Sequence, residues 1–202
     1  MRNILINTVK VLGVIAALWL LFFDASKIFL AIGEPVAATE LIEYYALPLG
    51  ILFAALSIAD LVNYKRKKVF AIFTIVFASI FIVLKSVSLI ASLFLGLITT
   101  IDTVFQTIYY GSNLLLYAAI ILYSIIVIKN KDSKILLTAF SVLLVAYLIV
   151  FIYGLWYFMS SYNLSLAEMY FAEDYGFVML MLSYLSYTVI FINNLWVKRE
   201  LL

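Results

Sequence analysis

Histidine and cysteine are absent from this chain, and each absence excludes a class of chemistry. Without cysteine there is no disulfide, thiolate nucleophile or iron–sulfur cluster, and without histidine there is no histidine-ligated haem. The usual zinc sites require one or both of these residue types. A histidine switch that works between about pH 5 and 8 is excluded as well. We therefore expect no metal site and no bound cofactor.

Charged residues are scarce: they make up 12% of the 202 residues, while hydrophobic residues make up 67%. Ordinary soluble domains contain about 25% charged and about 45–50% apolar residues. The apolar residues come in runs of about 20 or more, the length of helix that crosses a hydrocarbon core of ~30 Å. With only two prolines and seven glycines, little room is left for linkers. The composition predicts a single all-α domain embedded in a lipid bilayer.

Six apolar segments predict six transmembrane helices, and hence a polytopic helical membrane protein. The predicted spans are residues 8–30, 40–63, 69–95, 105–128, 135–158 and 176–197. The first span resembles a signal peptide in charge and apolarity. However, residues 22–25, Phe-Phe-Asp-Ala, lack the small-x-small pattern of a cleavage site, so we expect this span to be retained.

The basic residues orient the predicted spans. When both termini are placed in the cytoplasm, 11 of the 13 lysines and arginines fall at cytoplasmic ends. These 11 are Arg2, Lys10, Lys65, Arg66, Lys67, Lys68, Lys129, Lys131, Lys134, Lys198 and Arg199. Basic residues in short loops mark the cytoplasmic side of a membrane protein. The sequence therefore predicts cytoplasmic N- and C-termini, and the strong bias with short loops favours a bacterial inner (cell) membrane.

The third span is unusual in length and in containing Lys85. As one straight helix, residues 69–101 would extend about 50 Å, which exceeds the ~40–45 Å of a bilayer with its headgroups. Either the helix is long and tilted, or it stops near Gly96. Whether residues 86–104 form a loop, an interfacial helix or an extension of the span is left open. Lys85 lies about 24 Å along the helix from Val69, near the outer edge of the hydrocarbon core.

Polar side chains recur at helical spacing on two predicted spans. They are Lys85, Ser88 and Ser92 in the third span, and Tyr110, Asn113 and Tyr117 in the fourth. The favoured interpretation is a lysine that snorkels to the surface, with hydroxyls bonded to their own helix backbone. The alternative is an outward-facing polar vestibule that binds an anionic solute or headgroup. Polar residues of the fourth and sixth spans are interpreted as helix-packing contacts, at typically ~0.6 kcal/mol each.

Asp60 and the basic run that follows it form a second candidate region. A carboxylate inside a span is a functional candidate by default. Because Asp60 lies five residues before Lys65, we favour a structural ion pair near the inner interface. Lys65, Arg66, Lys67 and Lys68 are candidate contacts for a cytoplasmic partner or for anionic lipid, at ~1 kcal/mol per residue.

Catalytic motifs are absent from the sequence: there is no HExxH, GxSxG, P-loop or GxGxxG, and no nucleic-acid partner is expected. We therefore expect a non-enzymatic protein. The first hypothesis is an integral membrane subunit that acts as anchor, sensor or scaffold in a homo- or hetero-oligomeric complex, a class that includes immunity and defence modules. The second is a transporter or channel for small solutes or ions.

Overall fold

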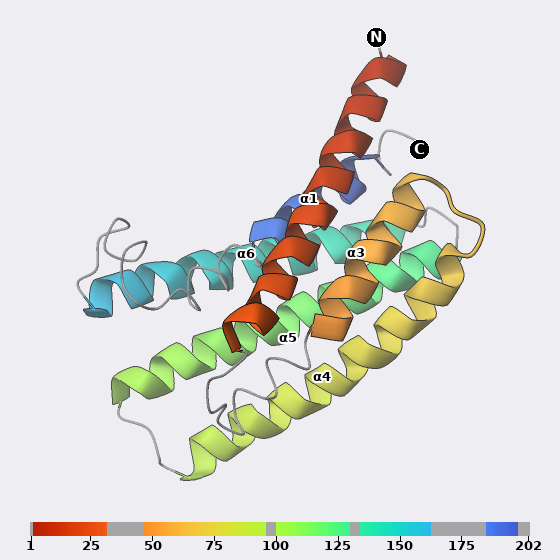
Figure 1. The fold of residues 1–202 in the computed structure, drawn as a ribbon. Helices are drawn as coiled ribbons and strands as arrows, with labels where there is room; N and C mark the ends of the chain where they lie inside the picture. Colours follow the sequence, from red (N-terminus) through yellow and green to blue (C-terminus); the bar gives the residue numbers. More distant parts are fainter. Residues whose placement is uncertain (1, 32–46, 96–99, 130–133, 163–184, 198–202) are drawn as a thin grey trace.

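The computed structural model describes residues 2–31, 47–95, 100–129, 134–162 and 185–197 (Figure 1). Its labelled helices are α1 (Arg2–Ala31), α3 (Leu47–Leu61), α4 (Lys67–Leu95), α5 (Thr100–Lys129) and α6 (Lys134–Tyr162). A further helix covers Leu185–Val197. Within these ranges the chain forms helices and turns and no strand, which confirms the predicted all-α class.

Within the described ranges, four helices are long and apolar enough to cross a membrane. The candidate spans are Ile4–Phe22 in α1, Lys67–Ile90 in α4, Tyr110–Lys129 in α5 and Lys134–Gly154 in α6. The described parts of α3 and of the helix Leu185–Val197 are shorter apolar helices. Residues 40–46 of the second predicted span and residues 176–184 of the sixth lie outside the described residues. The chain is thus a helical protein suited to a membrane by the length and composition of its helices.

The segment after Lys85 continues the third predicted helix. α4 runs to Leu95, and α5 begins at Thr100, five residues before the predicted start of the fourth span. With about 1.5 Å of rise per residue, each of these helices is about 45 Å long. The described residues of the segment 86–104 are therefore helical. Most of this segment extends α4 or α5 beyond the length of one membrane crossing.

Neighbouring helices in the sequence pack on one another. α5 packs against both α4 and α6, and α3 packs against both α1 and α4 (Figure 1). An aromatic cluster lies where α3, α5, α6 and the helix Leu185–Val197 meet. Its closest ring pairs are Phe53–Phe191, with centroids 5.1 Å apart, and Phe140–Phe191, at 5.2 Å. Tyr123 joins both sides of the cluster, 5.9 Å from Phe53 and 6.0 Å from Phe140.

The outer faces of the helices carry large apolar side chains. On α4, Ile72, Phe73, Val76 and Ile80 are exposed, whereas the buried residues of this helix include small or polar ones such as Ala71, Thr74 and Ala78. In water such a stripe would be an interaction site or an aggregation hazard. In a bilayer it is the expected surface, because lipid tails are as apolar as these side chains.

The connection between α3 and α4 is a tightly bonded turn. Asn63 has a positive φ of 53°. The N–H of Tyr64 donates to the carbonyl of Ala59 at 2.7 Å, and the N–H of Asn63 donates to the carbonyl of Asp60 at 3.1 Å. These two bonds are those of a Schellman motif, in which a left-handed residue lets the helix satisfy its last carbonyls. Asparagine is one of the few residues besides glycine that adopts this conformation readily.

Replacing Asn63 with alanine should cost about 1 kcal/mol more in free energy of unfolding than replacing it with glycine. Both variants remove the same amide side chain, so the difference isolates the backbone conformation. The comparison can be made from thermal unfolding midpoints of the two purified variants in one detergent. Equal midpoints would show that the turn does not depend on the left-handed residue.

Candidate functional site

A buried hydrogen-bond network lies at the end of the bundle where α3 leads into α4. The Asp60 carboxylate accepts a hydrogen bond from Lys67 Nζ at 3.0 Å and one from the Tyr123 hydroxyl at 2.8 Å. Lys67 Nζ also donates to Asn63 Oδ1 at 3.0 Å. The side chains of Asp60 and Lys67 are only 8% and 13% exposed. The ion pair predicted for Asp60 is confirmed, and its partner is the lysine at the start of α4.

Asn194 extends this network into the interior. Its Nδ2 donates to the Tyr123 hydroxyl at 3.0 Å and lies 3.3 Å from Ser57 Oγ. The helix Leu185–Val197 is thereby joined to α3 and α5, across 137 and 71 positions of sequence. Asn194 is 1% exposed, and its Oδ1 has no hydrogen-bond partner. An unpaired buried polar atom costs free energy, and the two hydrogen bonds of Nδ2 offset that cost. Asn194 therefore suits a structural role.

A second asparagine on the same helix fixes the position of α1. Asn193 is buried, and a Cβ added at Gly13 would overlap its Nδ2 and approach Leu61 Cδ1 to 2.8 Å. The amide therefore occupies the space that a side chain at position 13 would need. Only glycine allows the backbone of α1 to come this close, a common use of small residues where membrane helices pack.

The polar faces predicted on the third and fourth spans meet in the interface between α4 and α5. Lys85 is only 4% exposed, and its Nζ lies 5.5 Å from the centroid of the Tyr110 ring, within the range of a cation–π interaction. Asn113 and Tyr117 are buried in the same interface, where the Tyr117 ring lies 5.8 Å from that of Phe81. A lysine that snorkels to the surface is not what the structure shows, because the side chain is buried beside the Tyr110 ring.

The serines of this face fit the predicted backbone bonding in part. Ser88 donates its hydroxyl to the carbonyl of Leu84 at 3.0 Å, one turn earlier in the same helix. The side chain of Ser92 lies outside the described residues. In α5, Ser124 likewise donates to Ile120 at 2.8 Å. These hydroxyls are satisfied by their own helix, as is common for serine in apolar surroundings.

The four basic residues after Asp60 divide into two roles. Lys65, Arg66 and Lys68 are exposed, whereas Lys67 is turned inward to Asp60 and Asn63. Lys67 was predicted to be a surface contact, but its charge is paired with the Asp60 carboxylate inside the protein. Only three of the four predicted cations form the exposed surface of the turn.

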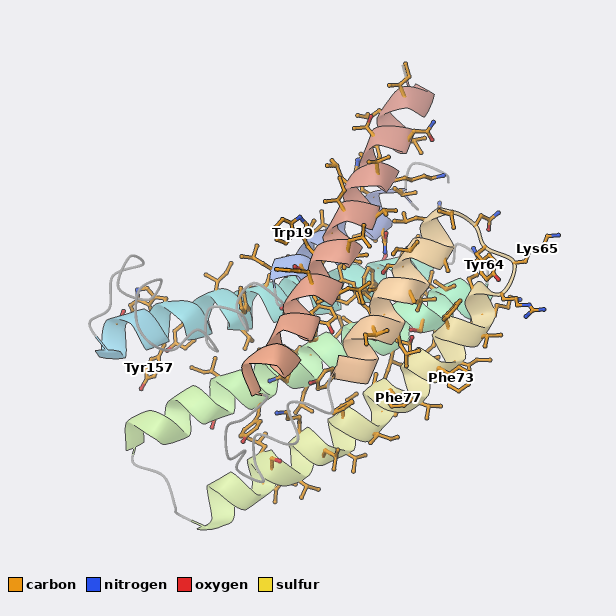
Figure 2. All side chains as sticks on the ribbon, viewed as in Figure 1. Trp19, Tyr64, Lys65, Phe73, Phe77 and Tyr157 are labelled. Atoms are coloured by element: carbon orange, nitrogen blue, oxygen red, sulfur yellow. The ribbon has the colours of Figure 1, made fainter. Side chains whose placement is uncertain are left out.

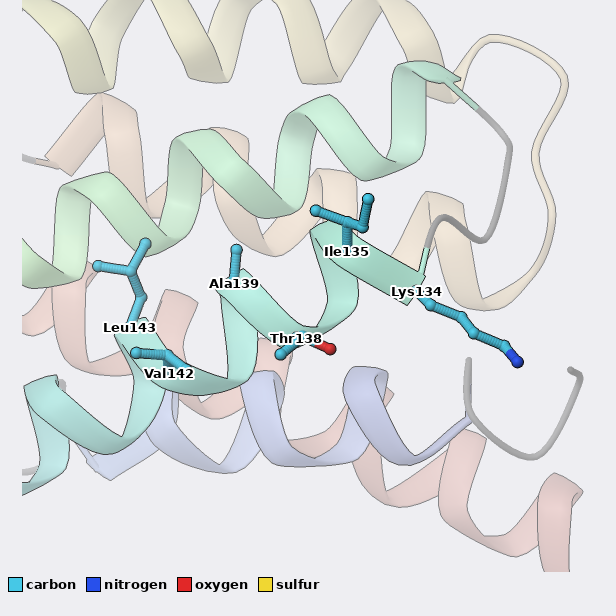
Figure 3. A pocket seen from close by; sticks show the side chains of 6 residues that line it. All are labelled: Lys134, Ile135, Thr138, Ala139, Val142 and Leu143. Carbon is cyan, nitrogen blue, oxygen red and sulfur yellow. The ribbon is translucent and has the colours of Figure 1, made fainter.

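A shallow apolar groove lies at the first part of α6 (Figure 3). Its lining consists of Lys134, Ile135, Thr138, Ala139, Val142 and Leu143. The lining is almost wholly apolar apart from Lys134 and the Thr138 hydroxyl at the start of the helix. A groove of this character suits hydrocarbon rather than a polar solute.

Metal-binding clusters are absent from the described ranges, in which no three carboxylate, histidine or cysteine side chains gather. Comparison with known protein families, with curated proteins and with solved structures gives no match for this chain. The function must therefore be inferred from the site itself.

Sequence reasoning did not find Tyr123 or Asn194 as partners of Asp60. Their predicted depth in the membrane, counted from the nearest basic residue, could have identified them. Asp60 lies five residues before Lys65, Tyr123 six before Lys129, and Asn194 four before Lys198. Measured back from basic residues that should share one interface, all three lie at a similar depth of roughly 6–9 Å. Polar residues at equal depth on different spans are candidates for a shared network.

Proposed function

We propose that the protein is a non-catalytic integral membrane subunit with six spans and cytoplasmic termini. It acts as an anchor, sensor or scaffold in a homo- or hetero-oligomeric complex of a bacterial inner membrane, where immunity and defence modules contain subunits of this kind. The observation that carries the proposal is the network of Asp60, Lys67, Tyr123 and Asn194. In this network, the polar groups that could have formed a catalytic or transport site are hydrogen-bonded to one another, and they join four helices.

The hydrogen bonds of the Asp60 carboxylate support this structural role. Its two carboxylate oxygens are each bonded, one to an ammonium and one to a phenol hydroxyl, at distances of 3.0 and 2.8 Å. A general acid or base must instead be able to reach a substrate atom. The outer faces of α4 and α6 remain apolar and exposed, so lipid or other membrane subunits can cover them.

The test is the state of the full chain after mild solubilisation. The tagged protein, extracted in a mild maltoside detergent, should elute with a stoichiometric partner or as an oligomer, and not at the 22.9 kDa of one chain plus its micelle. Light scattering gives the protein mass, and mass spectrometry identifies copurifying chains. The same tag on an unrelated six-span protein is the control. A lone monomer with no copurifying protein would contradict the proposal.

A transporter or channel is the second candidate, and the burial of Lys85 favours it. A buried cation beside Tyr110, Asn113 and Tyr117, between two long helices, has the composition of a path for an anionic solute. If anionic solutes pass through that interface, Lys85→Ala should abolish or reverse the preference for anions over cations in flux measurements on proteoliposomes. Unchanged flux in a variant that assembles as the unaltered protein does would remove transport through this face.

A further inference from the structure

We propose that the turn between α3 and α4 binds the headgroup phosphate of an anionic phospholipid through Lys65, Arg66 and Lys68. The acyl chains of that lipid would lie along the outer face of α4. This inference goes beyond the role proposed above, because it holds for a subunit and for a transporter alike.

The turn carries a cluster of positive charges. Lys65, Arg66 and Lys68 are exposed, and no acidic residue lies in the first turn of α4. The nearby Asp60 does not offset them, because Lys67 already pairs with its carboxylate at 3.0 Å. Among the described residues, these three cations therefore give the turn a net positive charge. Juxtamembrane lysines and arginines attract anionic lipid, and arginine can bond a phosphate through two N–H groups at once.

An apolar surface adjoins these cations, and it distinguishes a lipid from a soluble partner. Tyr64 is 48% exposed beside Lys65, and Val69 is exposed directly after Lys68. From there the exposed stripe of α4 continues through Ile72, Phe73 and Val76. Figure 2 shows Tyr64 and Lys65 at the turn, and Phe73 and Phe77 further along α4. Cations at the end of a continuous apolar stripe match a phospholipid, which has a charged head and long hydrocarbon chains.

Hydrogen bonds hold the turn in one conformation. Backbone bonds hold it on both sides: Tyr64 N–H to Ala59 at 2.7 Å, Lys67 N–H to Tyr64 at 3.2 Å and Val69 N–H to Arg66 at 3.0 Å. The side chain of Lys67 ties it to Asp60 and Asn63. The backbone that carries the three cations is thus positioned before any ligand arrives, which lowers the entropic cost of binding.

The experiment is a lipid titration of the full-length protein in a neutral maltoside detergent, followed by native mass spectrometry. The probes are dioleoyl phosphatidylglycerol and dioleoyl phosphatidylcholine, which share acyl chains and differ in headgroup charge. We expect phosphatidylglycerol to bind at least tenfold more tightly. Each cation should contribute about fivefold, so the triple variant K65Q/R66Q/K68Q should lose the preference.

The matched control is K10Q/K129Q/K134Q, which removes the same charge from other basic residues that the sequence assigns to the same side of the membrane. It should keep the preference for phosphatidylglycerol. Equal binding of the two lipids by the unaltered protein would overturn the proposal, and so would an equal loss of preference in both triple variants.

A competition separates a lipid from a free phosphate. Glycerol 3-phosphate should fail to displace phosphatidylglycerol at a hundredfold excess, because it lacks the acyl chains that contact α4. Displacement at or below that excess would overturn the assignment of a lipid. Thermal unfolding midpoints of the variants without lipid, recorded in the same samples, check that each variant is folded. The single variants K65Q and R66Q give a second, milder comparison.

Discussion

Replacing Asp60 with alanine should lower the free energy of unfolding by about 2–3 kcal/mol, because it leaves an ammonium and a phenol hydroxyl without their shared acceptor. Lys67 Nζ and the Tyr123 hydroxyl both donate to this carboxylate. The value lies below the full cost of breaking a deeply buried ion pair because Lys67, at 13% exposure, can turn toward water. For a chain of this size the loss corresponds to a thermal midpoint lower by roughly 5–10 °C.

Two further variants give this prediction its controls. Asp60→Asn keeps the shape and still accepts from Tyr123, so it should lose about half as much stability. Tyr153→Phe removes a hydroxyl from an exposed tyrosine of α6 and should change the midpoint by less than the measurement error. A midpoint of Asp60→Ala equal to that of the unaltered protein would mean that the ion pair contributes nothing.

The second large effect is expected at Gly13, where alanine should lower the free energy of unfolding by about 1–3 kcal/mol. The added Cβ would overlap Asn193 Nδ2 and stand 2.8 Å from Leu61 Cδ1. Either α1 moves away from its neighbours or the buried amide is displaced, and both outcomes weaken the contact between α1 and the rest of the bundle.

The same substitution at Gly111 should have the opposite sign. No described atom lies within 4 Å of a Cβ at this position, which is in the middle of α5. Alanine there should stabilise the protein by about 0.5–1 kcal/mol, because glycine in a helix interior costs that much in conformational entropy. Thermal midpoints of the two variants, measured side by side, check both signs. If Gly13→Ala were as stable as Gly111→Ala, the close approach of α1 would be disproved.

Helix positions were predictable from the sequence because apolar runs and basic clusters define where a span begins and ends. α6 (Lys134–Tyr162) covers the predicted span 135–158, and α4 starts two residues before its prediction. The end of α3 differs from its prediction by two residues as well, since the helix stops at Leu61 and Asn63 takes up the left-handed conformation. A hydropathy pattern cannot detect that conformation, whereas an asparagine before a basic run is a clue to it.

The partners of the polar residues were harder to predict, because hydropathy and charge give depth in the membrane but not rotation about the helix axis. Asp60 was expected to form an ion pair near Lys65, and the pair formed with Lys67, seven residues away across the turn. Lys85 was expected at the surface and is covered, because the polar faces of α4 and α5 face each other. Which faces meet depends on packing between helices, which a single sequence does not contain.

The polar groups between the helices should act together to hold the helices in place. A double-mutant cycle between Asp60→Ala and Tyr123→Phe tests it most directly, because each substitution removes the 2.8 Å hydrogen bond between two residues that lie 63 positions apart in sequence. Unfolding free energies of the two single variants and the double variant in one detergent should give a coupling of about 1 kcal/mol, within the range measured between membrane helices. Additive effects, with a coupling below about 0.3 kcal/mol, would contradict the account.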